Sequence, residues 1–490
     1  MGKFILTIDQ STSSTKVFLV DKKGNIVDKL GLDHRQIYPQ PGWLEHNPEE
    51  IYQNLLQLFH ELVEKQQLKN GDVEAISITN QRETCLLWDQ EGQPVQNAIV
   101  WQCNRTAPLC QQLIEAGHHD MIAEKTGLLI NPYFSATKLQ WLLQAYPSMQ
   151  QPYFGTMDSW IIYNLTNKKV HATDYTNASR TLLFNIHTLD WDSELIALFN
   201  ADNAKLPKIL ESDAAFGSTN DLRLPEALLA IPIYGVIGDS QGALFAQGCF
   251  KVGMAKATLG TGTSVLMNIG NSPIPVQNGL VTTVAWKLKS EINYALEGII
   301  YSTGDTISWA KNNLGLFKNY KELMEILENT PSSEGVVIIP AFHGMGAPYW
   351  NSEAKAAIYG LSRSSSSAHI IRACIESIAH QIRDVTQLIT KESALTIQAL
   401  RCDGGATSNH FLIQDLANFL QLNIKTTDKM DLSPLGAAFI CGLALGWWDL
   451  RTIENQLITY RSFNPTWDSQ RAIQKKKQWD SIAQNLNLFY

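Results

Sequence analysis

No run of apolar residues in this sequence is long enough to cross a lipid bilayer. The apolar, uncharged stretch at residues 435–448 is too short and is interrupted by glycine, so we expect it to form a buried helix. The N-terminus lacks the apolar core and small-residue cleavage site of a secretory signal, because residues 1–7 lead directly into a strand pattern. The sequence therefore predicts a cytoplasmic protein with no membrane partner.

Cysteine is scarce, and basic residues are not in excess. The 7 cysteines are scattered, and no two of them form a C-x-x-C pair. This pattern predicts buried free thiols in a reducing cytosol and no zinc site. The formal net charge of -8 gives none of the excess of positive charge that nucleic-acid binding requires, so no nucleic-acid partner is expected.

Two glycine motifs of nucleotide-binding enzymes are also missing. Neither the phosphate-loop pattern G-x-x-x-x-G-K-[ST] nor the dinucleotide pattern G-x-G-x-x-G occurs anywhere in the sequence. The first absence disfavours a Walker-type ATPase, and the second disfavours an oxidoreductase with a dinucleotide-binding fold.

A turn rich in hydroxyl groups follows an apolar strand near the N-terminus, and a similar turn recurs half a chain later. The two segments are residues 9–16 and residues 260–264. Glycine, serine and threonine offer backbone N–H groups and hydroxyls without bulk, as a close approach to phosphate oxygens requires. The repeat predicts two similar halves that face one cleft and hold a polyphosphate between them. The alternative is that each segment is an ordinary hairpin turn.

Two aspartates accompany these turns. Asp9 opens the first turn, and Asp239 follows a predicted strand over residues 233–237. Carboxylates at strand ends beside phosphate-binding turns suit Mg²⁺ binding and general-base catalysis. Alternatively, Asp239 caps the helix that follows it.

Apolar periodicity predicts a similar order of elements in the two halves. The 490 residues exceed what one core usually organises, so we expect two domains, 1–248 and 249–490. For the first half we predict a β-meander over residues 4–27, a helix from Asn47 and Pro48, a strand over 75–79 and an insertion over about 101–185. For the second half we predict strands at 258–267 and 294–295, a helix from about 306, a strand over 335–339, a helix over 369–391, a strand over 399–403 and a helix from 409.

Several long and uncommon strings carry a resemblance to a known family. They are residues 37–46 (IYPQPGWLEH), 78–84 (ITNQRET), 98–102 (AIVWQ), 133–142 (YFSATKLQWL), 174–181 (DYTNASRT), 340–342 (PAF), 346–350 (GAPYW), 356–376 and 403–405 (DGG). Over essentially its whole length the chain resembles the FGGY carbohydrate kinases, and among them the glycerol kinases. The resemblance implies an α/β fold of two actin-like ATPase (ribonuclease H-like) domains, with ATP and substrate in the cleft between them.

The resemblance also assigns roles to individual residues. It makes Asp239 the general base and implies that Asp9 and Asp239 place Mg²⁺ on the phosphates of ATP. The residues it implies for ATP binding are Thr12, Ser13, Ser14, Lys16, Gly260, Thr261, Gly262, Gly304, Ser308, Gly405 and Asn409. Ser11, Lys16 and Ser308 stand where the family pattern leads us to expect Gly, Arg and Gln.

For the acceptor the resemblance implies a pocket for a small polyol or sugar. The residues implied are Arg82, Glu83, Trp101, Tyr133, Asp239, Ser240 and Ser264. An arginine and a glutamate together engage vicinal hydroxyls, although two adjacent charges can also be a solvated pair. Ser240 replaces Gln and Ser264 replaces Phe of the glycerol kinases, which predicts a larger and more polar cavity.

The sequence leaves several alternatives open. Glycerol is the first choice of acceptor, and a longer C4 or C5 polyol or ketose, of the erythritol, erythrulose, xylulose or ribulose type, is the second. A non-catalytic ATP-binding sensor on the same frame is a third reading. Either a homodimer or a homotetramer is compatible with the sequence. Residues 218–232 lack the Gly-Gly-Thr-Arg loop that binds fructose 1,6-bisphosphate in some family members, so we expect no such inhibition.

Overall fold

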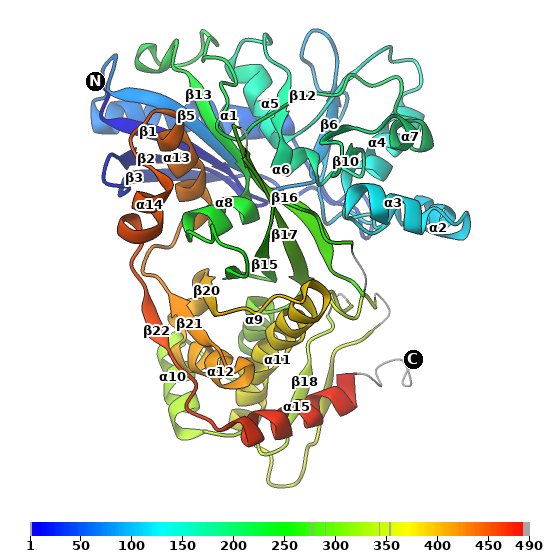
Figure 1. The fold of residues 1–490 in the computed structure, drawn as a ribbon, viewed down its shortest axis with the longest axis vertical. Coiled ribbons are helices and arrows are strands. Elements are labelled where there is room, and N and C mark those ends of the chain that lie inside the picture. The colour runs from blue at the N-terminus through cyan, green and yellow to red at the C-terminus, as the bar shows by residue number, and fades with distance from the viewer. Residues whose placement is uncertain (1, 276–277, 290, 343, 352–353, 484–490) are drawn as a thin grey trace.

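The structure is a computed structural model that describes residues 2–275, 278–289, 291–342, 344–351 and 354–483. Two sheets with helices packed against them form two lobes, of which the upper one in Figure 1 comes mainly from the first half of the chain. The lower lobe comes from the second half, whose helices α13 and α14 return to the upper lobe (Figure 1).

The upper lobe contains a five-stranded sheet in the order β13-β5-β1-β2-β3. The predicted meander is confirmed as the antiparallel strands β1 (Phe4–Gln10), β2 (Ser14–Asp21) and β3 (Ile26–Asp33). Strands β5 (Val73–Asn80) and β13 (Ile233–Gly238) extend the sheet in parallel on the other side of β1. The first turn is shorter than predicted, because β1 and β2 continue far enough to pair Asp9 with Lys16.

Helix α1 (Pro48–Gln66) begins where the sequence predicts it. The Asn47 side chain accepts hydrogen bonds from the backbone N–H groups of Glu49 and Glu50, and Pro48 occupies the first turn, where no N–H donor is needed. Its apolar face, which includes Leu55 and Phe59, lies in the same core as the first sheet. A short helix α8 (Asp239–Ala246) follows β13 directly.

The insertion begins earlier in the chain than predicted. A second, four-stranded sheet in the order β4-β7-β6-β8 takes three of its strands from before residue 101. These strands are β4 (Glu45–His46), β6 (Cys85–Trp88), β7 (Ala98–Ile99) and β8 (Tyr153–Thr156). The other elements are α2 (Ala107–Glu115), α3 (His119–Thr126), α4 (Ser135–Ala145), α5 (Met157–Leu165), β9 (Ala172–Asp174), α6 (Tyr175–Ala178), β10 (Phe184–Asn185), β11 (Asp190–Trp191), α7 (Ser193–Leu198) and β12 (Lys208–Leu210). Strands this short give little periodic signal, which is why their pairing was missed.

The sheet of the second half has seven strands in the order β16-β17-β15-β14-β20-β21-β22. Its strands are β14 (Ala255–Leu259), β15 (Thr263–Gly270), β16 (Val281–Leu288), β17 (Glu291–Ile300), β20 (Ala399–Asp403), β21 (Asn423–Thr426) and β22 (Arg461–Phe463). The β14-β15 hairpin and the parallel strands β20 and β21 repeat the arrangement of β1-β2, β5 and β13. The predicted duplication is therefore visible in the order of the strands.

One predicted strand of the second half lies elsewhere. The segment predicted over 335–339 is β18 (Val337–Ile339), which pairs with β19 (Ala357–Tyr359) in a separate two-stranded sheet. Its apolar run predicts a buried strand but does not say which sheet it joins. The helices are α9 (Gly304–Asn312), α10 (Tyr320–Asn329), α11 (Ser367–Ser393), α12 (His410–Leu420), α13 (Leu432–Ala444), α14 (Leu450–Thr452) and α15 (Ser469–Ala483).

Helices α8 and α13 cross where the two halves meet. Helix α13 is the buried helix predicted near residues 435–448, and it packs against α8 and against strands β13, β1 and β5 of the first sheet. The crossing depends on two glycines, because a Cβ added at Gly436 would lie only 1.9 Å from the carbonyl oxygen of Gly242. The division at residue 248 remains a prediction.

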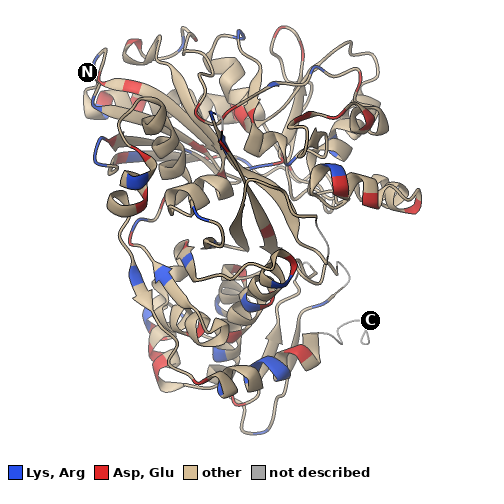
Figure 2. Cartoon of the chain, in the orientation of Figure 1, with Lys and Arg blue, Asp and Glu red and all other residues tan. Residues whose placement is uncertain are grey.

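Charged residues of both signs are interspersed along the helices of both lobes (Figure 2). All 7 cysteines are free and buried, as predicted. In the part of the chain that the structure describes, no helix combines the length and the apolar character needed to span a membrane.

Candidate active site

Three strands of the first sheet end side by side and bring the predicted site residues together. Gln10, Asn80 and Gly238 are paired across β1, β5 and β13 at the carboxyl ends of these strands. Arg82 therefore leaves the sheet beside Asp239, which is the first residue of α8. Ligands of open α/β sheets bind at this edge, where the chain segments beyond the strands are free to converge.

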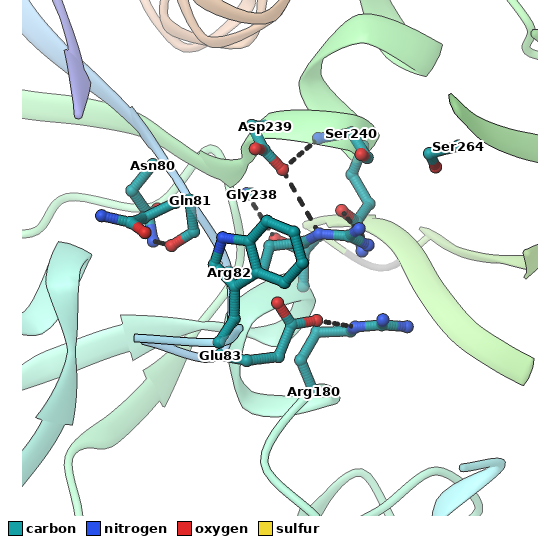
Figure 3. Close-up of polar contacts among 12 residues, drawn as sticks. Asn80, Gln81, Arg82, Glu83, Arg180, Gly238, Asp239, Ser240 and Ser264 are labelled. Atoms are coloured by element: carbon teal, nitrogen blue, oxygen red, sulfur yellow. Dashed lines mark hydrogen bonds and ion pairs between the residues drawn. The ribbon is translucent and has the colours of Figure 1, made fainter. Parts of the chain in front are cut away.

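Asp239 presents a partly exposed carboxylate at this edge. Its side chain is 38% exposed, and its Oδ1 lies 3.3 Å from Nε of Arg82. The same oxygen accepts a hydrogen bond from the backbone N–H of Ser240 (Figure 3). Gly238 occupies the N-cap position, so Asp239 lies inside the first turn of the helix. The carboxylate thus accepts a hydrogen bond in the first turn of the helix and is still partly exposed to solvent. A general base must be accessible to an incoming substrate in this way.

Arg82 and Glu83 belong to a buried cluster of four charges that we call the site cluster, together with Arg180 and Glu297. Both Nη atoms of Arg82 donate to Glu297, at 3.0 and 2.7 Å, and Nε of Arg180 donates to Glu83 at 2.6 Å. Nη1 of Arg180 lies 2.8 Å from Oε2 of Glu297. Figure 3 shows Arg180 beside Glu83, below Arg82 and Asp239.

The burial of the site cluster excludes the reading of Arg82 and Glu83 as a solvated pair. The two residues are only 5% and 1% exposed, and Glu297 is fully buried. Glu83 has a φ of 63°, which is left-handed backbone that non-glycine residues rarely adopt. Adjacent side chains of an extended strand point to opposite faces, and this turn lets Arg82 and Glu83 join one cluster.

Burial and the arginines act in opposite directions on the two glutamates. Burial alone would raise the pKa of Glu297, but the guanidinium groups of Arg180 and Arg82 outweigh it and hold that pKa well below its usual range. For Glu83 burial dominates, so its pKa is raised although Arg180 and Arg82 oppose the change. Glu297 is therefore the firmly ionised partner of both arginines.

Sequence reasoning did not single out Arg180 or Glu297. Arg180 lies within the string 174–181 that carries the resemblance, and this position was the signal that could have identified it. Glu297 is one glutamate in an apolar strand, β17, and a buried carboxylate at such a position requires a cationic partner. The need of Glu297 for a cationic partner was the signal that could have identified it as a site residue.

Two aromatic side chains stand beside the site cluster. The rings of Trp101 and Tyr133 are 5.2 Å apart, and the guanidinium of Arg180 lies 5.9 Å from the Tyr133 ring. The buried Lys138 ammonium donates to the backbone carbonyl groups of Pro132, Tyr133 and Phe134 and so fixes the turn that carries Tyr133. These rings can cover the carbon atoms of a polyol.

The first hydroxyl turn connects directly to this aromatic wall. The indole N–H of Trp101 donates to Oγ1 of Thr12 at 3.0 Å. The Thr12 carbonyl oxygen accepts from Nε2 of Gln36 at 3.0 Å and lies 2.9 Å from Nε2 of His34. Ser11 closes the turn, since its backbone N–H donates to the carbonyl oxygen of Ser14. The predicted phosphate contact and the predicted acceptor contact therefore share one hydrogen bond.

The second hydroxyl turn is built from close backbone contacts. Gly260 N–H donates to the carbonyl oxygen of Gly262 at 2.9 Å, and Gly304 N–H donates to the carbonyl oxygen of Gly260 at 3.0 Å. A Cβ added at Gly304 would lie 2.5 Å from that oxygen, so only glycine fits there. Gly260 and Thr261 remain exposed at the tip, as a phosphate-binding turn requires.

Three further residues predicted for nucleotide binding lie on helices and a loop of the second half. Asn409 is the N-cap of α12, and its Oδ1 accepts from two backbone N–H groups. Its buried Nδ2 has no hydrogen-bond partner within the described part of the chain. Gly405 is exposed, with open space where a Cβ would stand. Ser308 lines a cavity of about 300 Å³ together with Trp309 and Phe342.

Asp9 has the chemistry of a metal-facing carboxylate. Burial raises its pKa to about 7, Lys16 opposes this shift, and the nearby Asp239 and Asp431 add to it. A divalent cation would offset the repulsion among these carboxylates. No group of three or more potential metal ligands is assembled in the described ranges.

Comparison with known proteins matches both halves of the chain to one family. Residues 4–246 match the N-terminal domain, and residues 255–445 the C-terminal domain, of the FGGY family of carbohydrate kinases. Glycerol kinase 2 of Thermotoga maritima is 42% identical over 99% of both chains, and glycerol kinase 1 of that organism is 45% identical over 94% of both.

Solved structures support the same fold. The glycerol kinase of Plasmodium falciparum with ADP has a TM-score of 0.93 at 37% identity and covers 99% of this chain and 98% of its own. A ligand-bound xylulose kinase from Lactobacillus acidophilus has a TM-score of 0.89 at 23% identity, with the same coverage, and shows the fold alone. The predicted α/β fold of two actin-like ATPase domains is confirmed.

Proposed function

Because the chain belongs to the FGGY family of carbohydrate kinases, we propose that it transfers the terminal phosphoryl group of ATP to a terminal hydroxyl of glycerol. The product would be glycerol 3-phosphate. The observation that carries the proposal is the partly exposed carboxylate of Asp239, held 3.3 Å from the buried Arg82 at the edge where the strands end. The relatives named glycerol kinases support glycerol as the acceptor.

The residues have distinct tasks in this reaction. Arg82 and Glu83 orient the acceptor hydroxyls with a donor and an acceptor, and the rings of Trp101 and Tyr133 cover its carbon atoms. Asp239 takes the proton of the attacking hydroxyl as the new bond to phosphorus forms. Phosphoryl transfer depends mainly on alignment and on neutralisation of charge, and both are provided by side chains that burial holds in place.

ATP would be held by the exposed tips of the two hydroxyl turns, which approach it from the two halves of the chain. Their backbone N–H groups and hydroxyls supply donors to phosphate oxygens. Asp9 and Asp239 would hold Mg²⁺, which neutralises charge on the phosphate groups when it is bound. Gly405 and Asn409 would face the nucleoside, and the exposed Ser308 would leave the nucleotide base room.

A longer acceptor is the second candidate, and two small side chains favour it. Ser240 and Ser264 stand where bulkier residues were expected from the resemblance, and both are only partly buried. A C4 or C5 polyol or ketose would use the added space. We further propose a cytoplasmic enzyme, since its thiols are free, whose partners are small molecules and whose chains form a homodimer or a homotetramer.

An assay of ADP release over six acceptors tests the proposal. We expect the highest kcat/KM with glycerol among glycerol, erythritol, erythrulose, xylulose, ribulose and gluconate. A maximum at a four- or five-carbon acceptor would replace glycerol by the second candidate. ADP release that does not depend on any acceptor would contradict the kinase and favour a nucleotide sensor. Addition of millimolar fructose 1,6-bisphosphate should leave the rate unchanged.

A further inference from the structure

Glu297 is a carboxylate of the second half that is used by the site of the first half. It is fully buried in β17. Its Oε1 accepts from Nη2 of Arg82 at 2.7 Å and from Oγ of Ser264 at 2.8 Å. Its Oε2 accepts from Nη1 of Arg82 at 3.0 Å and lies 2.8 Å from Nη1 of Arg180. Among the described residues, its carboxylate is therefore bonded to the two arginines of the site cluster and to the Ser264 hydroxyl.

The register of the second sheet explains why Ser264 reaches Glu297. Ser264 of β15 is paired with Ile299 of β17, so Glu297, two residues before Ile299, is its diagonal neighbour on the same face of the sheet. A phenylalanine at residue 264 would have no hydroxyl to donate. The small side chain of Ser264 predicts space for a longer acceptor, and its hydroxyl also donates a hydrogen bond to Glu297.

Glu297 decides which way the Arg82 guanidinium faces. With both Nη atoms bound to Glu297, and Nη1 also 3.3 Å from Gln241, only the Nε edge faces Asp239. Within the described ranges, one N–H of Nη2 then remains available to an acceptor hydroxyl. A buried guanidinium that lost the carboxylate of Glu297 would turn to a remaining acid, and Asp239 already lies 3.3 Å from its Nε.

Resting on the function proposed above, we infer that Glu297 is a positioning residue for the acceptor. It holds Arg82 by a bidentate pair so that the guanidinium can bind an acceptor hydroxyl without occupying the carboxylate of Asp239. Because Glu297 belongs to the second half and Arg82 to the first, the acceptor pocket is complete only when the two halves meet. Ser264 supports the same carboxylate through one hydrogen bond.

The variant E297Q tests this role, with E376Q as its matched control. Glu376 is also a buried glutamate bound to two cations and a serine hydroxyl, Arg372, Lys475 and Ser333, but it lies away from the acceptor site. We expect E297Q to raise the KM for the acceptor about tenfold and to leave the KM for ATP within about twofold. E376Q should lower the melting temperature at least as much and leave both KM values unchanged.

Two further variants separate positioning from a loss of folding. S264A removes one hydrogen bond from Glu297 and should raise the acceptor KM about two- to fivefold, which can be measured even if E297Q does not fold. In an Arg82→Met background, E297Q should have no further effect on acceptor affinity, because Glu297 acts through Arg82. Equal effects of E297Q with and without Arg82 would overturn the inference.

Calorimetric titration with the same six acceptors, in the absence of ATP, distinguishes failure of this inference from failure of the proposed function. If the wild-type protein binds an acceptor but releases no ADP, the kinase proposal fails, while the dependence of binding on Glu297 is still measured. If the wild-type protein is an active kinase and neither E297Q nor S264A weakens acceptor binding, the kinase stands and the positioning role is wrong. An acceptor KM that rises equally in E376Q would also contradict it. A wild-type protein that binds none of the six would contradict both.

Discussion

The protein buries two clusters of charge that are alike in chemistry and differ in what lies beside them. The site cluster joins Arg82, Glu83, Arg180 and Glu297 across the two halves. A second cluster, which we call the core cluster, lies within the second half between α11, α12 and α15 and consists of Arg372, Glu376, Asp415 and Lys475.

In each cluster a glutamate accepts from two cations and one serine hydroxyl. The difference is one neighbouring carboxylate. Asp239, beside the site cluster, is 38% exposed, whereas Asp415, inside the core cluster, is only 4% exposed and is bound on both oxygens by Arg372. A buried ion pair contributes little net stability, because desolvation of the charges offsets their attraction. Two cations and a serine hydroxyl around a glutamate therefore contribute to folding alone in the core cluster. In the site cluster the same set of partners also lies beside the exposed carboxylate of Asp239.

The largest effect on activity is expected from removal of the exposed carboxylate of Asp239. We expect D239N to lower kcat about 10³-fold, because the amide cannot accept the proton of the attacking hydroxyl. Its melting temperature should change by only a few degrees, since the residue is partly exposed, and nucleotide binding should persist. Single-turnover kinetics and calorimetric titration with ATP measure the two quantities. Near-normal turnover would show that Asp239 is not the base.

The core cluster should show the opposite behaviour. E376Q leaves Arg372 and Lys475 short of a buried carboxylate, which should cost about 3 kcal/mol of unfolding free energy. Thermal unfolding and denaturant titration measure this cost, and the KM values measured on the folded fraction should not change. A shifted acceptor KM in E376Q would remove the distinction between the clusters.

Asp9 differs from the carboxylates of both clusters, because its buried carboxylate forms no ion pair within the described part of the chain. Burial raises its pKa from 3.8 to about 7. The folded protein therefore keeps a proton that the unfolded chain releases, so this stabilisation is complete below pH 4 and is lost as the pH rises through 7. In the ligand-free protein, D9N should remove this decline, which amounts to roughly 4 kcal/mol between pH 4 and pH 8. Melting temperatures of both proteins over that range provide the test, and identical pH profiles would contradict it.

The smallest effect is expected at Ser240. S240Q restores an amide beside Asp239 without altering the site cluster, so it should change specificity and not stability. We expect kcat/KM for glycerol to rise about threefold to tenfold relative to erythritol, which corresponds to the roughly 1 kcal/mol of one hydrogen bond. An unaltered ranking of the acceptors would show that residue 240 does not face the acceptor.

Periodicity and turn chemistry predicted most of the framework. The meander, α1, α11 and α13 all lie close to where they were expected, because each has a long apolar pattern, to which Asn47 adds a local start signal for α1. Pairing partners are not local, which is why the partner of β18 was not predicted and the two-residue strands β4 and β7 were missed.

Only part of the site was predicted, because many of its contacts join residues that are far apart in the sequence. Arg82, which lies in the string 78–84, and Asp239, which follows a predicted strand, were found from the sequence, and the structure brings them within 3.3 Å of each other. Arg180 and Glu297 were missed because their importance lies in contacts made across 97 and 215 positions of the chain. The use of the Ser264 hydroxyl by Glu297 depends on the register of two strands, which no single segment specifies.

The crossing of α8 and α13 has a consequence for the order in which the protein matures. The helix that begins with Asp239 rests on Gly436, so its seat is synthesised 197 residues (436 − 239) after its first residue. Domains that emerge first from the ribosome generally fold first. The amino-terminal lobe can therefore form its sheet early, but the helix that carries Asp239 lacks its packing partner until the segment around Gly436 has been synthesised. We expect a nascent chain that stops before this segment to be unable to consume ATP.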